Sequence, residues 1–100
     1  MYMLREVYQA QRGKVPEVIA SLKVFDELYE QEGFTNRRIF VDCSGPMDTV
    51  VYECELESLG DSYRMERSGC VDPDAETTAV IEAFNACTMS GHRELYKVIQ

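Results

Sequence analysis

Residues 34–56, FTNRRIFVDCSGPMDTVVYECEL, contain two runs of strand-forming residues separated by a turn. The runs 34–43 and 49–56 are rich in β-branched and aromatic side chains, which favour strands. The five residues between them, 44–48, include Gly, Pro and Asp, which favour turns. The sequence therefore predicts a β-hairpin in the middle of the chain.

An amphipathic helix is predicted before this hairpin, from about Pro16 to about Glu32. Pro16 suits the first helical turn, and Gly33 suits the position just beyond the last turn. Apolar side chains recur at intervals of three and four residues along this segment, at Val18, Ile19, Leu22, Phe25, Leu28 and Tyr29.

A second helical region is predicted after the hairpin. It starts at Ser58, with Asp61 placed as in a capping box, and is interrupted at 68–71. Asp72-Pro73 then provides a new N-cap and first helical residue. The helix is expected to run to about Thr88 and to be terminated by Ser90-Gly91.

Residues 2–9 and 92–99 have the composition of two further strands, which gives the order β-α-β-β-α-β. We predict one α+β domain over residues 1–100 with this ferredoxin-like arrangement. Right-handed crossovers place both helices on the same face of the four-stranded sheet. The other face carries both charged and large apolar residues, so we expect a homodimer formed through this open sheet face.

The net charge of −8 and the sequence pI of about 4.5 argue against nucleic acid and anionic membranes as partners. The four cysteines show no C-x-x-C pair, so no metal site is expected. No signal peptide or long apolar run is visible, which predicts a cytoplasmic protein with reduced thiols. The thiols at 43, 54 and 87 are expected to be inert and mostly buried, and Cys70 to be the most exposed.

Three sets of polar residues are candidates for a site. His92, the single histidine, is a candidate general base, although a solvated histidine at a strand start is ordinary. Glu53 and Glu55 are a candidate carboxylate pair, but they also suit an ion-pair network with Arg5 and Arg37. The residues that suit either a ligand cavity or a dimer interface are Arg38, Tyr52 and Tyr96.

The chain resembles the dimeric α+β barrel superfamily and, within it, small NIPSNAP-like proteins. The similarity covers nearly the whole chain in order, and residues 49–59 are similar to a strand that runs into an E-S-L helix start. The other matching segments are Leu4-Arg5-Glu6-Val7-Tyr8, Gly13-Lys14, Gly33-Phe34 and Arg93-Glu94-Leu95-Tyr96-Lys97-Val98-Ile99.

This resemblance implies a dimer whose two sheets form one barrel, with a cavity either between the sheet and the helices or inside the barrel. A small ligand in the barrel cavity is expected, and no cofactor is expected. The activity it implies is unassigned, as for most NIPSNAP-like proteins. One alternative is a purely structural or regulatory interaction protein. The other is a cofactor-independent monooxygenase or isomerase that acts on a small aromatic or polyketide-like substrate. In that case the candidate catalytic residues are His92, Glu53 and Arg38, and the candidate ligand-binding residues are Arg5, Tyr52 and Tyr96. Haem-degrading members are not matched, because the chain has no tryptophan.

Overall fold

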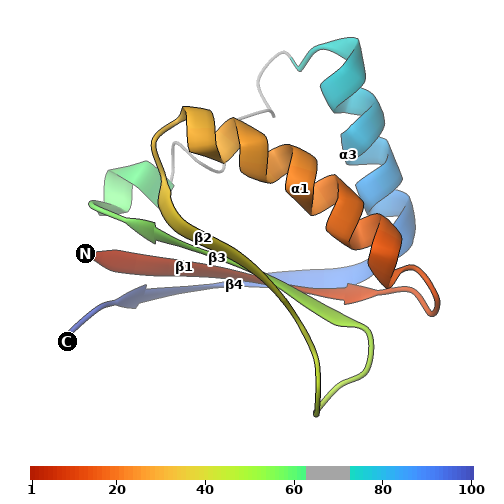
Figure 1. Cartoon of the computed structure of the whole chain (residues 1–100), viewed down its shortest axis with the longest axis horizontal. Coiled ribbons are helices and arrows are strands. Elements are labelled where there is room, and N and C mark those ends of the chain that lie inside the picture. The colour runs from red at the N-terminus through yellow and green to blue at the C-terminus, as the bar shows by residue number, and fades with distance from the viewer. Residues whose placement is uncertain (63–72) are drawn as a thin grey trace.

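The structure is a computed structural model that describes residues 1–62 and 73–100. It is an α+β fold in which a four-stranded antiparallel sheet, in the order β2-β3-β1-β4, carries helices on one face (Figure 1). The ferredoxin-like order predicted from the sequence is confirmed. Its described elements are β1 (Tyr2–Ala10), α1 (Val15–Gln31), β2 (Thr35–Val41), β3 (Thr49–Leu56), α3 (Ala75–Cys87) and β4 (Thr88–Lys97).

The predicted boundaries of α1 and β3 are confirmed within one residue. Pro16 lies in the first turn of α1, where its missing N–H costs no hydrogen bond. Gly33 follows the C-cap residue Glu32 with a φ of 90°, a left-handed conformation that favours glycine. Its N–H donates to the carbonyl of Glu30, which ends the helix.

The second helical region differs from its prediction in where α3 starts and in what terminates it, while its predicted end near Thr88 is confirmed within one residue. Residues 59–62 are helical, and the carboxylate of Asp61 accepts a hydrogen bond from the Ser58 N–H, as predicted. The predicted interruption at 68–71 lies outside the described residues. The predicted N-cap Asp72 also lies outside the described residues. The prediction that Pro73 is the first helical residue is wrong, because α3 starts at Ala75 and the side chain of Asp74 accepts from the Thr77 N–H.

The predicted stop at Ser90-Gly91 is also wrong, since both residues lie inside β4. The helix α3 ends at Cys87 and passes directly into the strand, where Thr88 has an extended backbone. Gly91 is required there by packing rather than by a turn. It faces Tyr8 in the register, and a Cβ at this position would lie 2.8 Å from Cδ1 of that ring.

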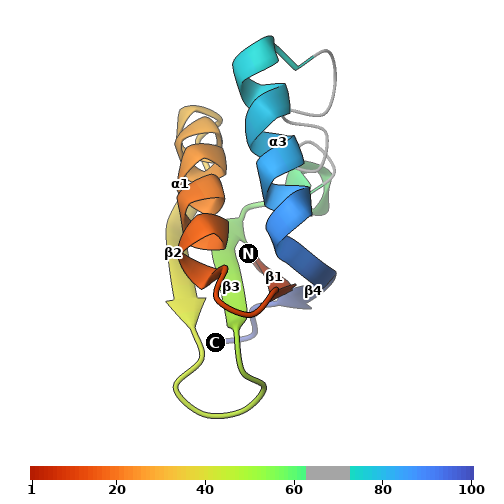
Figure 2. The ribbon, with the colours of Figure 1, turned by 90° about the vertical axis from the view of Figure 1, so that its right-hand side faces the viewer.

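The core lies between the sheet and α1. Alternate residues of β1 and β3 point toward the helices, and Figure 2 shows α1 lying along that face of the sheet. On α3 only Cys87 is buried, although the Phe84 ring contacts those of Tyr8 and Phe25. The fully buried side chains shared by sheet and α1 include Leu4, Val18, Leu22, Val50, Tyr52, Cys54 and Leu56.

A hydrogen-bonded triad fixes α1 against the sheet. The carboxylate of Asp26 on α1 accepts the Tyr52 hydroxyl at 2.7 Å and the Nε of Arg37 at 2.8 Å. These two donors come from β3 and β2, so one helix side chain ties two strands together. Arg37 therefore belongs to the helix-covered face.

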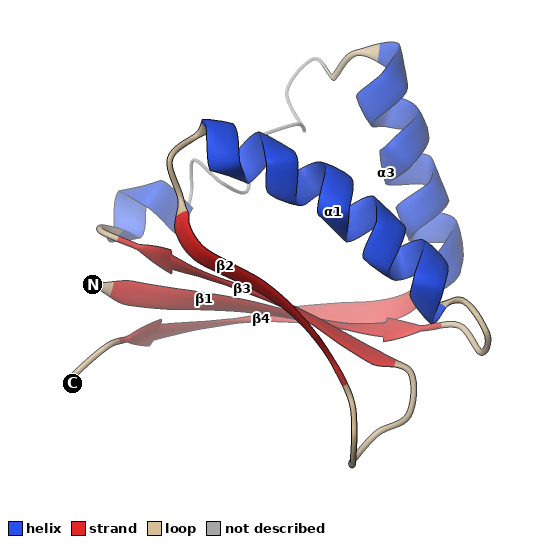
Figure 3. Cartoon of the chain, viewed as in Figure 1, coloured by secondary structure: helices blue, strands red, loops and turns tan. Residues whose placement is uncertain are grey.

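The opposite face of the sheet has no helix over it in the described part of the chain (Figure 3). The pairing register assigns to it Met3, Arg5, Val7 and Gln9 of β1, Thr49, Val51, Glu53 and Glu55 of β3, Arg38 and Phe40 of β2, and Ser90, His92, Glu94 and Tyr96 of β4. We call this surface the open face. Among the described residues, no helix has the length and apolar character needed to cross a bilayer.

Candidate functional site

A row of ion pairs crosses the open face, and Glu53 is at its centre. The Glu53 side chain is only 7% exposed although it carries a charge. Its Oε2 accepts Nε and Nη2 of Arg5 at 3.2 and 3.0 Å, and its Oε1 accepts Nη2 of Arg38 at 3.0 Å. Both carboxylate oxygens are thus bonded to guanidinium groups, which is the condition for keeping a buried charge.

The row continues onto β4 through Glu94. Its Oε1 lies 3.6 Å from Nη1 of Arg5, and its Oε2 lies 3.0 Å from Nε2 of His92. The Tyr96 hydroxyl donates to Glu94 Oε1 at 2.8 Å. Hydrogen bonds from Tyr96 and His92 lower the pKa of Glu94, so this carboxylate stays ionised in neutral solution. The row therefore joins all four strands in the sequence Arg38, Glu53, Arg5, Glu94, His92.

Aromatic rings lie beneath both guanidinium groups. The Arg38 guanidinium lies 5.3 Å from the Phe40 ring centre, and that of Arg5 lies 5.9 Å from the Tyr96 ring centre. Both distances are within the range of cation–π attraction. The rings thus help to hold the two cations flat against the sheet.

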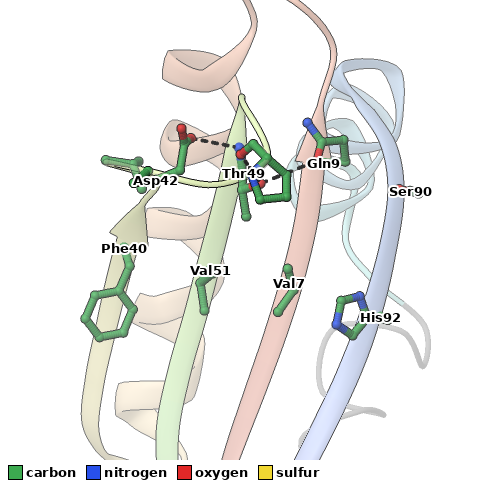
Figure 4. A pocket seen from close by; sticks show the side chains of 11 residues that line it. Val7, Gln9, Phe40, Asp42, Thr49, Val51, Ser90 and His92 are labelled. Atoms are coloured by element: carbon green, nitrogen blue, oxygen red, sulfur yellow. Dashed lines mark hydrogen bonds between the residues drawn. The ribbon is translucent and has the colours of Figure 1, made fainter.

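A hollow of about 400 Å³ lies beside this row, toward the β2–β3 turn (Figure 4). Its floor is apolar. It consists of the side chains of Val7, Val51 and Phe40, which come from three adjacent strands. His92 forms part of its wall (Figure 4). A second hollow of about 400 Å³ shares these four residues and reaches the ion-pair row at Arg5, Glu53 and Glu94.

Polar groups order the turn end of the hollow. The Thr49 N–H donates to Oδ1 of Asp42, and the Thr49 hydroxyl donates to the carbonyl of Pro46 at 2.8 Å. Gln9 extends from β1 and also donates to the carbonyl of Met47. The hollow therefore combines a flat apolar floor with polar walls, an arrangement typical of sites for small organic molecules.

The structure brings most of the candidate residues together. Arg5, Arg38, Glu53, His92 and Tyr96 all lie on the open face. The predicted ion-pair network exists, but Arg38 takes the place predicted for Arg37. In the described part of the chain, Glu55 lies on the same side of β3 and forms no ion pair.

Tyr52 does not share a surface with Arg38 and Tyr96. It is 1% exposed on the helix-covered face, and its hydroxyl is bonded to Asp26. Burial and the neighbouring Asp26 raise the pKa of Tyr52 far above its ordinary value, so it remains a neutral donor. The structure gives it the position of a core residue.

The sequence did not identify Glu94 or the apolar floor as parts of the site. The alternation of His92, Glu94 and Tyr96 on one side of a strand was a signal for Glu94. The floor required the register between β2 and β3, which places Phe40 opposite Val51. Composition alone does not give that register.

Within the described residues, the cysteines and the possible metal ligands add no further site. Cys54 and Cys87 are buried free thiols as expected, whereas Cys43 is exposed, which corrects its expected burial. Cys70 lies outside the described residues. Over 1–62 and 73–100, no group of three or more His, Cys, Asp or Glu side chains is placed to hold a metal ion.

Neither a family model nor a curated protein matches the sequence. Solved structures do match the fold over nearly the whole chain. A NIPSNAP domain protein from Burkholderia xenovorans has a TM-score of 0.77 and 14% identity, and covers 98% of this chain and 94% of its own. A NIPSNAP family protein from Agrobacterium tumefaciens has a TM-score of 0.78 and 17% identity, over 96% and 90% of the two chains.

SnoaB, a cofactor-independent oxygenase from Streptomyces nogalater, has a TM-score of 0.74 and 10% identity, over 99% of this chain and 93% of its own. A structure described as an antibiotic biosynthesis monooxygenase has a TM-score of 0.73 and 17% identity, over 100% of both chains. Identities this low establish the fold and no activity. The chain thus has the ferredoxin-like α+β fold that solved NIPSNAP proteins share with these monooxygenases.

Proposed function

We propose that the chain works as a homodimer that holds a small organic ligand between two open faces. The observation that carries this proposal is the apolar floor of Val7, Val51 and Phe40 at the centre of a sheet face that no helix covers over residues 1–62 and 73–100. Phe40 and Tyr96, both on the open face, are 38% and 46% exposed. A second copy placed over this face removes apolar area from water, which is the main driving force for association.

The charges on the open face are compatible with such burial. Apart from His92, the row consists of two arginines and two glutamates, whose formal charges cancel before any partner arrives. Burying charges that are already paired costs less than burying single ones. The two hollows then become an enclosed chamber, and a chamber of this kind suits a small, largely apolar ligand.

A pair of lysine substitutions tests the dimer. Val51→Lys places a charge at the centre of the open face, whereas Val24→Lys places one at a position of α1 that is 37% exposed. By light scattering at micromolar concentration, we expect dimers for the wild type and Val24→Lys, and monomers for Val51→Lys. A monomeric wild type rules out the proposed dimer.

The ligand is tested separately by amide NMR with a panel of small aromatic compounds. Binding in the chamber should shift the amide signals of Thr49 and Val51, and Phe40→Ala should weaken binding by removing part of the floor. Leu59→Ala, a change at an exposed residue away from this face, is the control. If no compound shifts an amide signal around the floor while the protein is dimeric, the proposed ligand site is wrong and the proposed dimer still stands.

A second candidate function is cofactor-independent oxygenation of an aromatic substrate. The observation that favours it is the His92–Glu94 pair at 3.0 Å beside the apolar floor. A carboxylate orients an imidazole, which can then take a proton from a hydroxyl group of a substrate. Oxygen uptake with hydroquinones should fall in His92→Ala and persist in Ser90→Ala. Equal rates in wild type and His92→Ala remove His92 from any such reaction.

A further inference from the structure

A second polar cluster lies on the other face of the sheet, toward the helices. Glu6 of β1 is 8% exposed and has a buried apolar neighbour, Leu4, on the same side of the strand. Its Oε2 accepts the Tyr8 hydroxyl at 3.0 Å and Nε of Arg93 at 3.1 Å. Arg93 is the residue opposite Glu6 on β4.

Gly91 and Phe84 position Tyr8 for this contact. The ring of Tyr8 packs closely against Gly91, where a Cβ would come within 2.8 Å. The Phe84 ring meets Tyr8 edge-on at 4.8 Å between ring centres. Burial and the nearby Glu6 raise the pKa of Tyr8 far above its ordinary value, so its hydroxyl remains a donor to Glu6.

The second oxygen of Glu6 is available to a ligand. Both donors bond to Oε2, and no described residue donates to Oε1. No fully buried side-chain oxygen in the described chain lacks a partner, so Oε1 is not sealed from solvent. Glu6 lines a hollow of about 260 Å³ together with Tyr8, Gly91, His92 and Arg93.

The charge balance of this hollow selects the kind of ligand. Arg93 already offsets the charge of Glu6, so an added ion would bring an unmatched charge to a largely buried carboxylate. A neutral molecule with a hydroxyl group supplies the missing donor without that cost. The Tyr8 ring in the wall favours an aromatic ligand.

We propose that Glu6, Tyr8 and Arg93 form a binding site for a small neutral phenol, whose hydroxyl donates to Oε1 of Glu6. Glu6, Tyr8 and Arg93 lie on the opposite side of the sheet from the proposed dimer chamber, so the site does not depend on the dimer, although His92 borders both hollows. A volume of about 260 Å³ restricts it to single-ring compounds, since sites for larger ligands begin near 300 Å³.

Phenol and anisole test the site in the unmodified protein. The two molecules have similar size, but anisole has no hydroxyl hydrogen to donate. In ligand titrations followed by amide NMR, phenol should bind about tenfold more tightly than anisole and shift the Gly91 and Arg93 signals. Equal binding of the two, or shifts confined to Thr49 and Val51, overturns the proposal.

Two carboxylate variants locate the contact. Glu6→Gln should weaken phenol binding about tenfold, because the amide is a poorer acceptor and its N–H₂ group competes for the same space. Glu55→Gln, which removes a charge from the open face where Glu55 forms no ion pair in the described part of the chain, should leave binding unchanged. Unchanged binding in Glu6→Gln overturns the proposal, and if that variant does not fold, the comparison of phenol with anisole decides alone.

Discussion

At the scale of single residues, the two carboxylates buried in the sheet follow the same rule on opposite faces. Counted over the whole residue, Glu53 and Glu6 are 6% and 8% exposed, and each accepts a hydrogen bond from an arginine of a neighbouring strand. They differ in how many of their oxygens are used. Both carboxylate oxygens of Glu53 accept hydrogen bonds from arginines, which stabilises the sheet. In Glu6 only Oε2 accepts from described residues, so Oε1 is a candidate acceptor for a ligand.

Tyr52→Phe measures the triad that joins α1 to the sheet. The change removes the buried hydroxyl that donates to Asp26 and leaves the ring in place. We expect the free energy of unfolding to fall by about 1.5–3 kcal/mol, as for a hydrogen bond to a charged group. Urea unfolding measures this loss, and Tyr96→Phe at the exposed end of β4 should leave the urea midpoint nearly unchanged. A smaller loss for Tyr52→Phe than for Tyr96→Phe would contradict the assignment of Tyr52 to the core.

The thiols of Cys43 and Cys54 should differ in reactivity. Burial raises the pKa of Cys54 to about 12, whereas Cys43 is exposed at the end of β2. Since the thiolate is the reactive form, iodoacetamide at pH 8 should modify Cys43 and leave Cys54 unmodified until the protein is unfolded. Mass spectrometry of the peptides reads out each site. Early modification of Cys54 in the folded protein would show that β3 is not buried.

At the scale of elements, Gly33 ends α1 in a conformation that other residues adopt at a cost. Gly33→Ala should lower the free energy of unfolding by about 1 kcal/mol or more, because alanine is strained at a φ of 90°. Gly60→Ala is the control, since Gly60 is helical and a Cβ there meets only Ser58 Oγ at 3.7 Å. That change should be neutral or stabilising. Thermal unfolding of both variants checks the pair, and an equal loss in both would refute the role of Gly33.

The elements whose limits are predicted most accurately are those bounded by turn or capping residues in their own stretch of sequence. The strand β3 has the predicted limits, because a turn cluster precedes it and Ser58 starts a helix after it. The limits of β4 were wrong because Ser90-Gly91 resembles a helix stop, while its real constraint is the Tyr8 ring on another strand. Contacts between segments distant in sequence are not encoded in local pattern.

The same reason explains why Arg37 and Arg38 were exchanged in the predicted network. The pairing of β2 with β3 shifts between Thr35 and Arg38, and Asn36 has a φ of 49° there. An irregularity of this kind changes which residues of a strand face each side of the sheet. The residues of the candidate site were visible in the sequence, but their division between the two faces required this register.

At the scale of the whole molecule, the two faces of one sheet have different chemistry. The helix-covered face buries Tyr8, Tyr52 and Cys54, whose acidic protons are retained because burial disfavours their charged forms. The open face carries ion pairs that remain charged. The stability of the fold in alkali is therefore set by the helix-covered face.

We expect the folded state to lose stability as the pH rises above about 9. The unfolded chain releases the Cys54 proton near pH 9.0, while in the folded state its pKa is raised to about 12, so the folded state holds more protons over this interval. Tyr8 and Tyr52 add to the effect from their ordinary pKa of 10.0 upward. Stability falls with pH wherever the folded state binds more protons, and the contribution of Cys54 is complete below pH 9 and lost as the pH approaches 12.

Urea midpoints between pH 7.5 and 11 measure this decline. The double variant with Tyr52→Phe and Cys54→Ala should be less stable at pH 7.5 but decline less steeply, because two of the three titrating groups are gone. If the urea midpoint declines with pH at the same rate in the wild type and the double variant, the protons of Tyr52 and Cys54 are not the cause of the decline.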